Sequence, residues 1–440
     1  MALGQAGVGK AELFGELDAA RVNDADWRRG RTFSLVYYAG DDVLDVLRHA
    51  YASYIHENGL SLDAFASLRR FEREVVADAC ELFGAGCGSM TSGGTESVFM
   101  AVKAARDHAR QTRPDVQNPH ILVPKTAHPA FDKAAHVLGI GIVHASVGED
   151  QRVDVAAVRA LLTPDTILVV GTAYTFPHGV VDDLVALAAL AQERGVLFHV
   201  DACLGGFILA FAGEAGGVAV PFDFRVPGVT SLSVDLHKYG YCAKGASLVL
   251  YRDRALRRAQ FFATTEWPGG LYGSPTMAGT RPGGAIAAAW AVMRHLGREG
   301  YVRLTRVVLE TSAALRAGIA ATPGLRLLGD GQHSVLAFTG AEVAPGYTVD
   351  VYAVDERLRR QGWHLDRLQG PPGLQMIVTP AHEGVVEAFL ADLRAATAEV
   401  VAGKVAAEAD GAIYGALTTL PDRALVESLV LDWMDGMDEG

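Results

Sequence analysis

The chain has 440 residues, 50% of them hydrophobic and 20% charged, which is typical of a globular protein with a large core. Its 51 acidic residues outnumber the 39 basic ones, and no basic cluster stands out, so a nucleic-acid partner is not expected. No apolar run is long enough to span a bilayer, and the four cysteines fit neither a metal-binding nor a disulfide pattern, which predicts a cytoplasmic protein without a metal site.

The N-terminal part of the chain is predicted to be helical. The first thirty residues have weak periodicity and are expected to be a loose terminus rather than a subunit contact. They include a G-x-x-x-x-G-K pattern over residues 4–10, but Ala11 stands where a nucleotide-binding loop needs a hydroxyl, and no strand precedes it. Apolar residues at helical spacing then predict two helices, over residues 42–54 and 65–83.

The middle of the chain alternates short apolar runs with helical stretches. The predicted strands are residues 121–123, 141–143, 166–170, 196–200, 230–234 and 247–251. Fully apolar strands separated by helices are typical of a mainly parallel sheet that is covered on both faces. We therefore predict an α/β fold.

Beyond about residue 300 the pattern changes again. A helix, two short strands near Leu325 and Val335, a helix over residues 349–361 and a last long helix after His382 indicate a smaller α+β domain. The predicted organisation is an N-terminal helical segment (1–87), a large α/β domain (88–300) and a C-terminal α+β domain (301–440).

Residues 91–97, with the sequence TSGGTES, precede a helical run over residues 98–110. The two glycines let the backbone approach an anion, the hydroxyls donate hydrogen bonds, and the helix N-terminus adds oriented N–H groups. The same residues also suit an ordinary capped turn, so this motif alone predicts either a phosphate site or a turn.

Two later apolar strands end in polar residues. Asp201 follows the run FHV, and His237 and Lys238 follow SVDL. Open α/β sheets bind ligands at the carboxyl ends of such strands, where a buried carboxylate needs a cationic partner. Enclosure there is expected to lower the pKa of Lys238 until its amine is nucleophilic. Taken singly, Asp201 also suits a capping role and Lys238 a solvated one, but the three motifs together match the phosphate, ring nitrogen and aldehyde of pyridoxal 5'-phosphate.

From about residue 30 to its C-terminal residues, the chain resembles the pyridoxal-phosphate-dependent sphingosine-1-phosphate lyases, relatives of the group II amino-acid decarboxylases. The most specific stretches are TSGGTES from Thr91, FPHG from Phe176, HVDACLGGF from His199, FDFRVPGVTSLSVDLHKYGYCAKGASLVLY from Phe222 and SPTMAGTRPGG from Ser274. The resemblance implies fold type I of these enzymes, the aspartate aminotransferase-like fold, with a mainly parallel seven-stranded sheet. It also implies a homodimer in which residues 274–284 reach the neighbouring subunit's active site.

The resemblance further assigns roles to individual residues. Lys238 would carry the cofactor as a Schiff base, Asp201 would bind its ring nitrogen, and His128 would stack on its ring. The residues implied to bind the cofactor are Ser92, Gly93, Gly94, Thr95, His128, Thr172, Asp201, His237, Lys238, Gly279 and Thr280. Tyr37, Asn58, Ser61 and Lys244 would form the substrate pocket, and Lys244 would join Lys238, His128 and Asp201 as a catalytic residue.

One position departs from the family pattern. Ser61 stands where the lyases have a histidine that helps to bind the substrate phosphate, so a phosphorylated substrate is less strongly expected. The implied activity is retro-aldol cleavage of a β-hydroxy amine to an aldehyde and a smaller amine. An amino-acid decarboxylase on the same scaffold stays open, with an amine or amino acid as substrate. A non-catalytic binding module is the least favoured hypothesis, because all the reactive positions hold competent residues.

Overall fold

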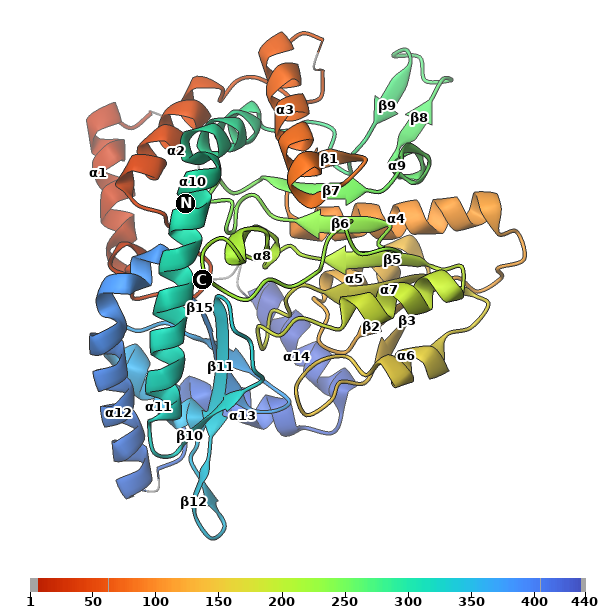
Figure 1. Cartoon of the computed structure of the whole chain (residues 1–440). Helices are drawn as coiled ribbons and strands as arrows, with labels where there is room; N and C mark the ends of the chain where they lie inside the picture. Colours follow the sequence, from red (N-terminus) through yellow and green to blue (C-terminus); the bar gives the residue numbers. More distant parts are fainter. Residues whose placement is uncertain (1–6, 62, 404, 437–440) are drawn as a thin grey trace.

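The computed structural model describes residues 7–61, 63–403 and 405–436, which form a large α/β lobe and a smaller α+β lobe (Figure 1). Residues 4–6 of the G-x-x-x-x-G-K pattern lie outside the described residues, and Lys10 begins helix α1. No helix among the described residues combines the length and apolar character that a membrane span requires. Nor do the described residues contain a group of three metal-ligating side chains.

A seven-stranded sheet forms the centre of the large lobe, as the sequence predicted. Its strands are β1 (Cys87–Thr91), β2 (His120–Pro124), β3 (Gly141–Ala145), β4 (Thr166–Thr172), β5 (Leu197–Asp201), β6 (Ser231–Val234) and β7 (Ser247–Tyr251). The spatial order is β1-β7-β6-β5-β4-β2-β3. The strands from β3 to β6 pair in parallel, whereas β7 is antiparallel to both β6 and β1. Strand β1 was not among the predicted strands, because its sequence CGSMT lacks a β-branched apolar run.

Helices cover both faces of this sheet (Figure 1). Those between the strands are α4 (Gly94–Thr112), α5 (Ala130–Leu138), α6 (Val155–Leu161), α7 (Leu184–Glu193), α8 (Gly206–Ala212) and α9 (Arg254–Gln260). The N-terminal elements are α1 (Lys10–Ala20), η1 (Arg21–Asn23), η2 (Trp27–Arg29), α2 (Asp41–Ser53) and α3 (Ala66–Phe83). Helices α2 and α3 agree closely with the predicted ranges, and α1 buries none of its residues.

The small lobe contains a four-stranded antiparallel sheet of order β10-β11-β15-β14. Its strands are β10 (Leu325–Leu328), β11 (Val335–Gly340), β14 (Asp366–Leu368) and β15 (Gly373–Ile377). The hairpins are β8 (Phe262–Thr264) with β9 (Tyr272–Ser274), and β12 (Glu342–Ala344) with β13 (Tyr347–Thr348). The remaining helices are α10 (Gly283–Ala320), α11 (Val351–Arg360), η3 (Pro380–Val385), α12 (Val386–Gly403), α13 (Ala409–Thr419) and α14 (Arg423–Gly436). The sequence predicted only β10 and β11 here, and it predicted one helix where α12, α13 and α14 follow each other.

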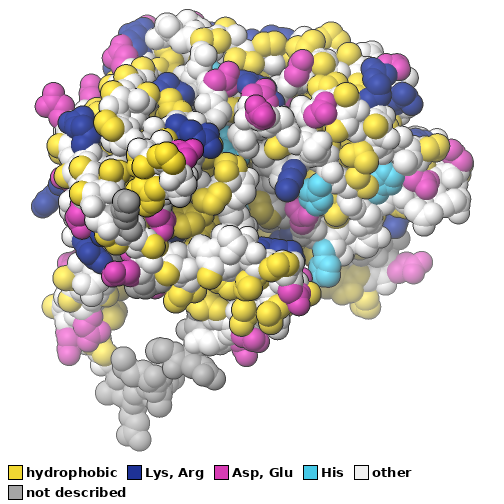
Figure 2. Space-filling model, turned by 90° about the horizontal axis from the view of Figure 1, so that it is seen from below, with side chains coloured by type: hydrophobic (Ala, Val, Ile, Leu, Met, Phe, Trp, Pro, Cys, Tyr) yellow, Lys and Arg dark blue, Asp and Glu magenta, His cyan; other side chains and the backbone are white. Residues whose placement is uncertain are grey.

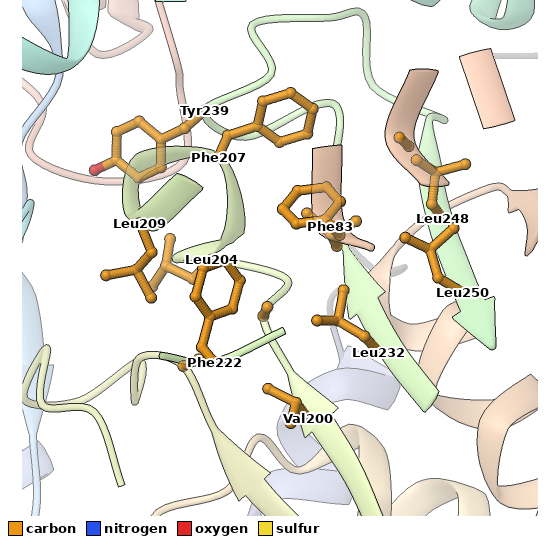
Figure 3. Packing of buried hydrophobic residues seen from close by; sticks show 14 of the residues in the cluster. Phe83, Val200, Leu204, Phe207, Leu209, Phe222, Leu232, Tyr239, Leu248 and Leu250 are labelled. Atoms are coloured by element: carbon orange, nitrogen blue, oxygen red, sulfur yellow. The ribbon is translucent and has the colours of Figure 1, made fainter. Parts of the chain in front are cut away.

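Helix α10 connects the lobes and is broken at Gly297, whose φ of 54° and ψ of −173° are not helical. The predicted boundary at residue 300 lies just beyond this break. In the large lobe, Val200, Leu232 and Leu248 of the central sheet pack beside Phe83 and Phe222 (Figure 3). The small lobe has a separate hydrophobic cluster, which includes Phe33, Trp363 and Phe389.

One buried histidine of the small lobe makes folding sensitive to pH. His382 Nδ1 accepts a hydrogen bond from Thr379 N at 2.8 Å, and Nε2 lies 2.9 Å from Thr32 O, so both bonds suit the neutral ring. Burial lowers the pKa of His382 from 6.5 to about 4. Because the unfolded chain takes up this proton below pH 6.5 and the folded chain only below about pH 4, acid favours the unfolded chain across this window.

Acidification from pH 7 to pH 5 is therefore expected to lower the free energy of unfolding by about 2 kcal/mol more in the native protein than in His382→Gln. Denaturant unfolding at both pH values measures this difference. His136→Gln, a change on the exposed surface of α5, is the matched control and should keep the native pH dependence. An equal loss of stability in the native protein and His382→Gln would contradict the assignment.

Candidate active site

A cavity of about 400 Å³ lies where β4, β5 and β6 end and α4 begins. It brings together most of the predicted cofactor-binding residues. Its lining residues are Ser92, Gly93, Gly94, Thr95, Glu96, Val98, His128, Ala130, Thr172, Tyr174, Phe176, Asp201, Cys203, Leu204, Asp235, His237 and Lys238. This position, at the carboxyl ends of parallel strands, is the usual ligand site of open α/β sheets.

Lys238 forms an ion pair inside this cavity. Its Nζ lies 3.0 Å from Asp235 Oδ2, and Asp235 is almost completely buried. Burial by itself would lower the pKa of Lys238, but the Asp235 carboxylate outweighs it, so the pKa of Lys238 is raised. Burial likewise opposes ionisation of Asp235, yet Lys238 and His237 lower its pKa. The prediction that the pocket lowers the pKa of Lys238 was therefore wrong, because it overlooked the carboxylate three residues before the lysine.

Asp201 is buried at the end of β5 and lines the same cavity. Its Oδ1 accepts hydrogen bonds from Cys203 N at 3.0 Å and from Ser233 Oγ at 3.2 Å. In the part of the chain that the structure describes, no cationic side chain forms an ion pair with Asp201. Burying a carboxylate without a nearby cation costs free energy, so Asp201 suits a ligand that carries a positive charge.

His199 precedes Asp201 by two residues in β5 and has a structural role. Its two ring nitrogens lie 2.9 Å from Ser231 Oγ and 3.1 Å from Ser233 Oγ. Burial lowers the pKa of His199 to about 4, which keeps the ring neutral. The histidine therefore positions Ser233, one of the two groups that hold the Asp201 carboxylate.

The N-terminus of α4 lines the cavity next to Asp235 and Cys203. A Cβ at Gly94 would lie 2.8 Å from Asp235 Oδ2 and 3.0 Å from Cys203 Sγ, so only glycine fits this close approach. His237 and Thr172 line the same cavity, and their buried Nδ1 and Oγ1 atoms have no hydrogen-bond partner among the described residues. Buried polar atoms are normally paired, so these atoms and the free N–H groups of α4 suit an anionic ligand.

We expect Gly94→Ala to weaken binding of pyridoxal 5'-phosphate at least about tenfold, because the added methyl group displaces the first turn of α4 from its anion-binding position. Titration of cofactor-free protein, followed by visible absorbance, measures the dissociation constant. Gly384→Ala is the matched control, since no atom lies within 4 Å of its added Cβ. Equal affinity in Gly94→Ala and the control would contradict an anion site at this turn.

His128 and two further aromatic residues form one wall of the cavity. His128 Nδ1 accepts a hydrogen bond from Ala130 N at 3.1 Å, which fixes the ring near the start of α5. Phe176 meets His128 edge-on, with ring centroids 6.4 Å apart. Tyr174 is buried, and its hydroxyl hydrogen-bonds to Ser334 of the small lobe. Tyr174 therefore links the cavity to the small lobe, a link that the sequence analysis did not anticipate.

The predicted substrate residues do not line this cavity. Lys244 Nζ donates to Leu35 O at 2.9 Å and to His237 O at 3.4 Å, and it lies 5.0 Å from the centre of the Tyr37 ring. Burial, with a smaller contribution from Lys238, lowers the pKa of Lys244 to about 8. Lys244 and Tyr37 thus lie together behind His237.

The other predicted residues gather at a separate hollow of about 330 Å³. Ser61 and Gly279 line it, together with Arg281, and Asn58 Nδ2 donates to Thr280 Oγ1 at 3.2 Å. In this single chain, Asn58, Ser61, Gly279 and Thr280 are therefore grouped with each other but not with Lys238.

Two of the lining residues that were not predicted are carboxylates. Asp235 precedes Lys238 by three residues, so its place in the motif SVDLHK was the available signal. Glu96 belongs to TSGGTES and is only 8% exposed. A carboxylate beside a phosphate site is repelled by the phosphate, so it is unfavourable there unless other groups donate hydrogen bonds to it. Ser92 of the same motif supplies two of those donors, whereas no local sequence signal identifies the other two, Met277 N and Ala278 N.

Comparison with known proteins assigns this site to a family. Residues 37–340 match the family model described as the pyridoxal-dependent decarboxylase conserved domain. The chain belongs to this family. Sphingosine-1-phosphate lyase from Arabidopsis thaliana is 41% identical over 436 residues, which cover 96% of this chain and 79% of that protein.

Solved structures agree with this membership of the pyridoxal-dependent decarboxylase family. Sphingosine-1-phosphate lyase from Burkholderia pseudomallei is 37% identical, with a TM-score of 0.86, and covers 92% of this chain and 94% of its own. Glutamate decarboxylase from Lactobacillus brevis has a TM-score of 0.79 at 18% identity, covering 91% and 94% of the two chains, a likeness that concerns the fold alone. The fold-type prediction is confirmed, and the protein is a pyridoxal-phosphate-dependent enzyme of the lyase class.

The cavity fits this cofactor at each of its reactive groups. Lys238 offers a primary amine for the aldehyde, and Asp201 offers a carboxylate that lacks a cation for the ring nitrogen. The first turn of α4, with Gly93, Gly94 and the unpaired His237 Nδ1, offers donors for the phosphate. These three groups enclose a volume of about 400 Å³, which accommodates a small ring and a substrate beside it.

Proposed function

We propose that the protein cleaves the carbon–carbon bond between the amine-bearing carbon and the hydroxyl-bearing carbon of a β-hydroxy amine, releasing an aldehyde and a smaller amine. The observation that carries this proposal is the cavity in which the Lys238–Asp235 pair faces Asp201, a carboxylate without an ion-pair partner among the described residues. The identity to sphingosine-1-phosphate lyases favours carbon–carbon cleavage over other reactions of the scaffold.

Each residue of the cavity has a defined task in this proposal. The bound cofactor supplies electron withdrawal from the bonds at the carbon beside the substrate nitrogen. Lys238 holds the cofactor covalently, and Asp201 keeps the ring nitrogen charged. His128 and Phe176 enclose the ring from one side, which fixes the orientation of the substrate. Because orientation selects the bond that breaks, this enclosure matters as much as the reactive groups.

The proposed reaction needs no further reactant. The substrate's β-hydroxyl loses its proton, a C=O bond forms there, and the Cα–Cβ bond breaks with its electron pair passing to Cα. Cα then accepts a proton, so atoms and charge balance between one β-hydroxy amine and the products. Lys238 lines the cavity, and its amine, when neutral, would be available to accept the proton of the β-hydroxyl.

The alternative is decarboxylation of an amino acid, which the family model and the shared fold keep open. Product analysis with a panel of β-hydroxy amines and amino acids separates the two reactions. We expect aldehyde, captured by a hydrazine reagent, from the native protein and none from Lys238→Ala. Carbon dioxide without aldehyde would overturn the lyase proposal in favour of a decarboxylase.

Ser61→His is expected to improve the use of a phosphorylated β-hydroxy amine about tenfold over its unphosphorylated analogue, because a histidine adds a charge-assisted hydrogen bond to phosphate. The ratio of kcat/KM for the two substrates measures this preference. Ser146→His, an exposed change after β3, is the matched control and should leave the ratio unchanged. An unchanged ratio in Ser61→His would remove residue 61 from the substrate pocket.

We also propose a cytoplasmic homodimer with shared active sites. The four cysteines are unpaired, which supports a reducing compartment. The β8–β9 hairpin exposes Phe262, Trp267 and Leu271, the last at 85%, and these side chains suit burial against a second copy. Such a dimer would bring Asn58, Ser61, Gly279 and Thr280 to the partner's cavity. Sedimentation of the purified protein distinguishes dimer from monomer, and cell fractionation tests the compartment.

A further inference from the structure

Glu96 connects two segments that lie far apart in the sequence. Its Oε2 accepts hydrogen bonds from Ser92 N and Ser92 Oγ, both at 2.6 Å. Its Oε1 accepts hydrogen bonds from the backbone N–H groups of Met277 and Ala278, at 2.7 and 3.2 Å. One buried side chain therefore joins the turn before α4 to residues 276–280, which we call the 276–280 segment.

Among the described residues, the other hydrogen bonds of the 276–280 segment to the rest of the chain lie at its two ends, and Ser274 Oγ donates to Thr276 O at 2.9 Å at its start. Thr276 Oγ1 donates to Ala278 O at 2.9 Å within the segment, and Asn58 Nδ2 donates to Thr280 Oγ1 at 3.2 Å at its end. The Met277 side chain is 56% exposed, although its N–H points inward to Glu96. Glu96 therefore holds the backbone of Met277 and Ala278, whereas Asn58 holds Thr280 at the other end of the segment.

We propose that Glu96 is a positioning residue that couples the cofactor-binding turn at Ser92–Thr95 to the 276–280 segment. This inference rests on the proposed cofactor site at α4 and deepens it. When the turn is fixed by the cofactor, Glu96 is fixed with it, and the segment that presents Gly279 and Thr280 becomes ordered. Once ordered, the 276–280 segment keeps the Glu96 side chain in position, and this strengthens cofactor binding.

The coupling requires a carboxylate rather than an amide. All four groups that surround the two oxygens of Glu96 are donors in this arrangement. A glutamine has the same shape, but its NH₂ group cannot accept, so one side of the connection loses its hydrogen bonds and faces another donor. Glu96→Gln therefore breaks either the Ser92 or the 276–280 contact without leaving a cavity.

The test compares Glu96→Gln with Asp107→Asn. Asp107 is a matched control because it lies on the same helix and accepts from Lys103, Arg106 and Arg110, but does not line the cavity. Titration of cofactor-free protein with pyridoxal 5'-phosphate should show binding weakened about tenfold to a hundredfold in Glu96→Gln. Asp107→Asn should stay within about twofold of the native protein.

Amide hydrogen exchange of the 276–280 segment provides a second readout. In the native protein the cofactor should slow exchange at Met277 and Ala278, and in Glu96→Gln this protection should be lost. A purely structural role would lower the melting temperature without affecting exchange in this segment. Native affinity together with native exchange in Glu96→Gln would overturn the inference.

Two further outcomes keep the inference separate from the proposed function. If the native protein shows no absorbance change with the cofactor, the proposed function fails. If amide hydrogen exchange of the 276–280 segment is the same in the native protein and in Glu96→Gln, the inference about Glu96 fails, whatever the outcome for the proposed function. If Glu96→Gln does not fold, Glu96→Asp replaces it, since a side chain one methylene shorter cannot reach both segments. Unchanged exchange in a folded Glu96→Asp variant would equally overturn the coupling.

Discussion

Replacing Lys238 with alanine is expected to abolish covalent attachment of pyridoxal 5'-phosphate and to lower kcat/KM at least about 10³-fold. Lys238 Nζ is the primary amine that lines the cavity, and it lies 3.0 Å from Asp235 Oδ2, the oxygen that also lies against Gly94 in the first turn of α4. Without it, the cofactor has no amine in position to form a covalent bond. The loss should therefore appear both in the visible spectrum and in turnover.

The measurement combines absorbance of the reconstituted protein with mass spectrometry after borohydride reduction, which locates the adduct on a peptide. Lys133→Ala, a change of an exposed lysine on α5, is the control and should retain the native spectrum and activity. An adduct on another lysine in the native protein, or an unchanged spectrum in Lys238→Ala, would refute the assignment.

Replacing Asp235 with asparagine is expected to move the pH midpoint of cofactor attachment downward by about one pH unit or more. Only the neutral amine attacks an aldehyde, and the Asp235 carboxylate raises the pKa of Lys238 against the opposing effect of burial. The variant removes the charge of Asp235, but Lys238 remains buried. The pKa of Lys238 therefore falls, and its amine loses the proton at a lower pH. Attachment at neutral pH should then become faster.

Stopped-flow absorbance of cofactor-free protein, mixed with pyridoxal 5'-phosphate across a pH series, gives this midpoint. Asp42→Asn changes an exposed carboxylate that pairs with His295 and should leave the midpoint unchanged. An unchanged or higher midpoint in Asp235→Asn would show that another group controls the charge of Lys238. Activity need not rise in the variant, because Asp235 also lies 3.6 Å from His237 Nε2.

The central fold could be predicted because its strands are buried on both faces. Runs such as Val196 to Val200 are apolar throughout, and this pattern indicates a parallel sheet without knowledge of any partner strand. Strand β1 is held by pairing with the distant strand β7, and β15 by pairing with β11, whereas β14 is an edge strand that pairs with β15. Their short sequences, which include Gly88 and Gly373, carry no such pattern, so the sequence analysis missed them.

The cofactor motifs were predictable for a similar reason, whereas their electrostatics were not. Asp201 and Lys238 lie at the ends of recognisable strands, Gly94 begins a recognisable helix, and the topology brings these three positions to one cavity. The pKa direction of Lys238 depends on a distance of 3.0 Å to Asp235, and the four donors of Glu96 include two from a segment about 180 residues away. Such contacts are set by tertiary packing. The roles of Tyr37, Asn58 and Ser61 stay predictions. One chain does not bring Asn58 and Ser61 to Lys238, and Tyr37 interacts electrostatically with Lys238 without lining the cavity.

The strand order has a consequence for synthesis of the chain on the ribosome. Strand β1 pairs only with β7 in the central sheet, with Cys87–Thr91 opposite Tyr251–Ser247. The turn that follows β1 therefore has no fixed support until about 160 further residues have been translated, which takes on the order of 10–30 s. Vitamin B6 capture during translation is consequently expected to begin only after β7 has emerged from the exit tunnel, and a nascent chain truncated before that strand should not retain the coenzyme.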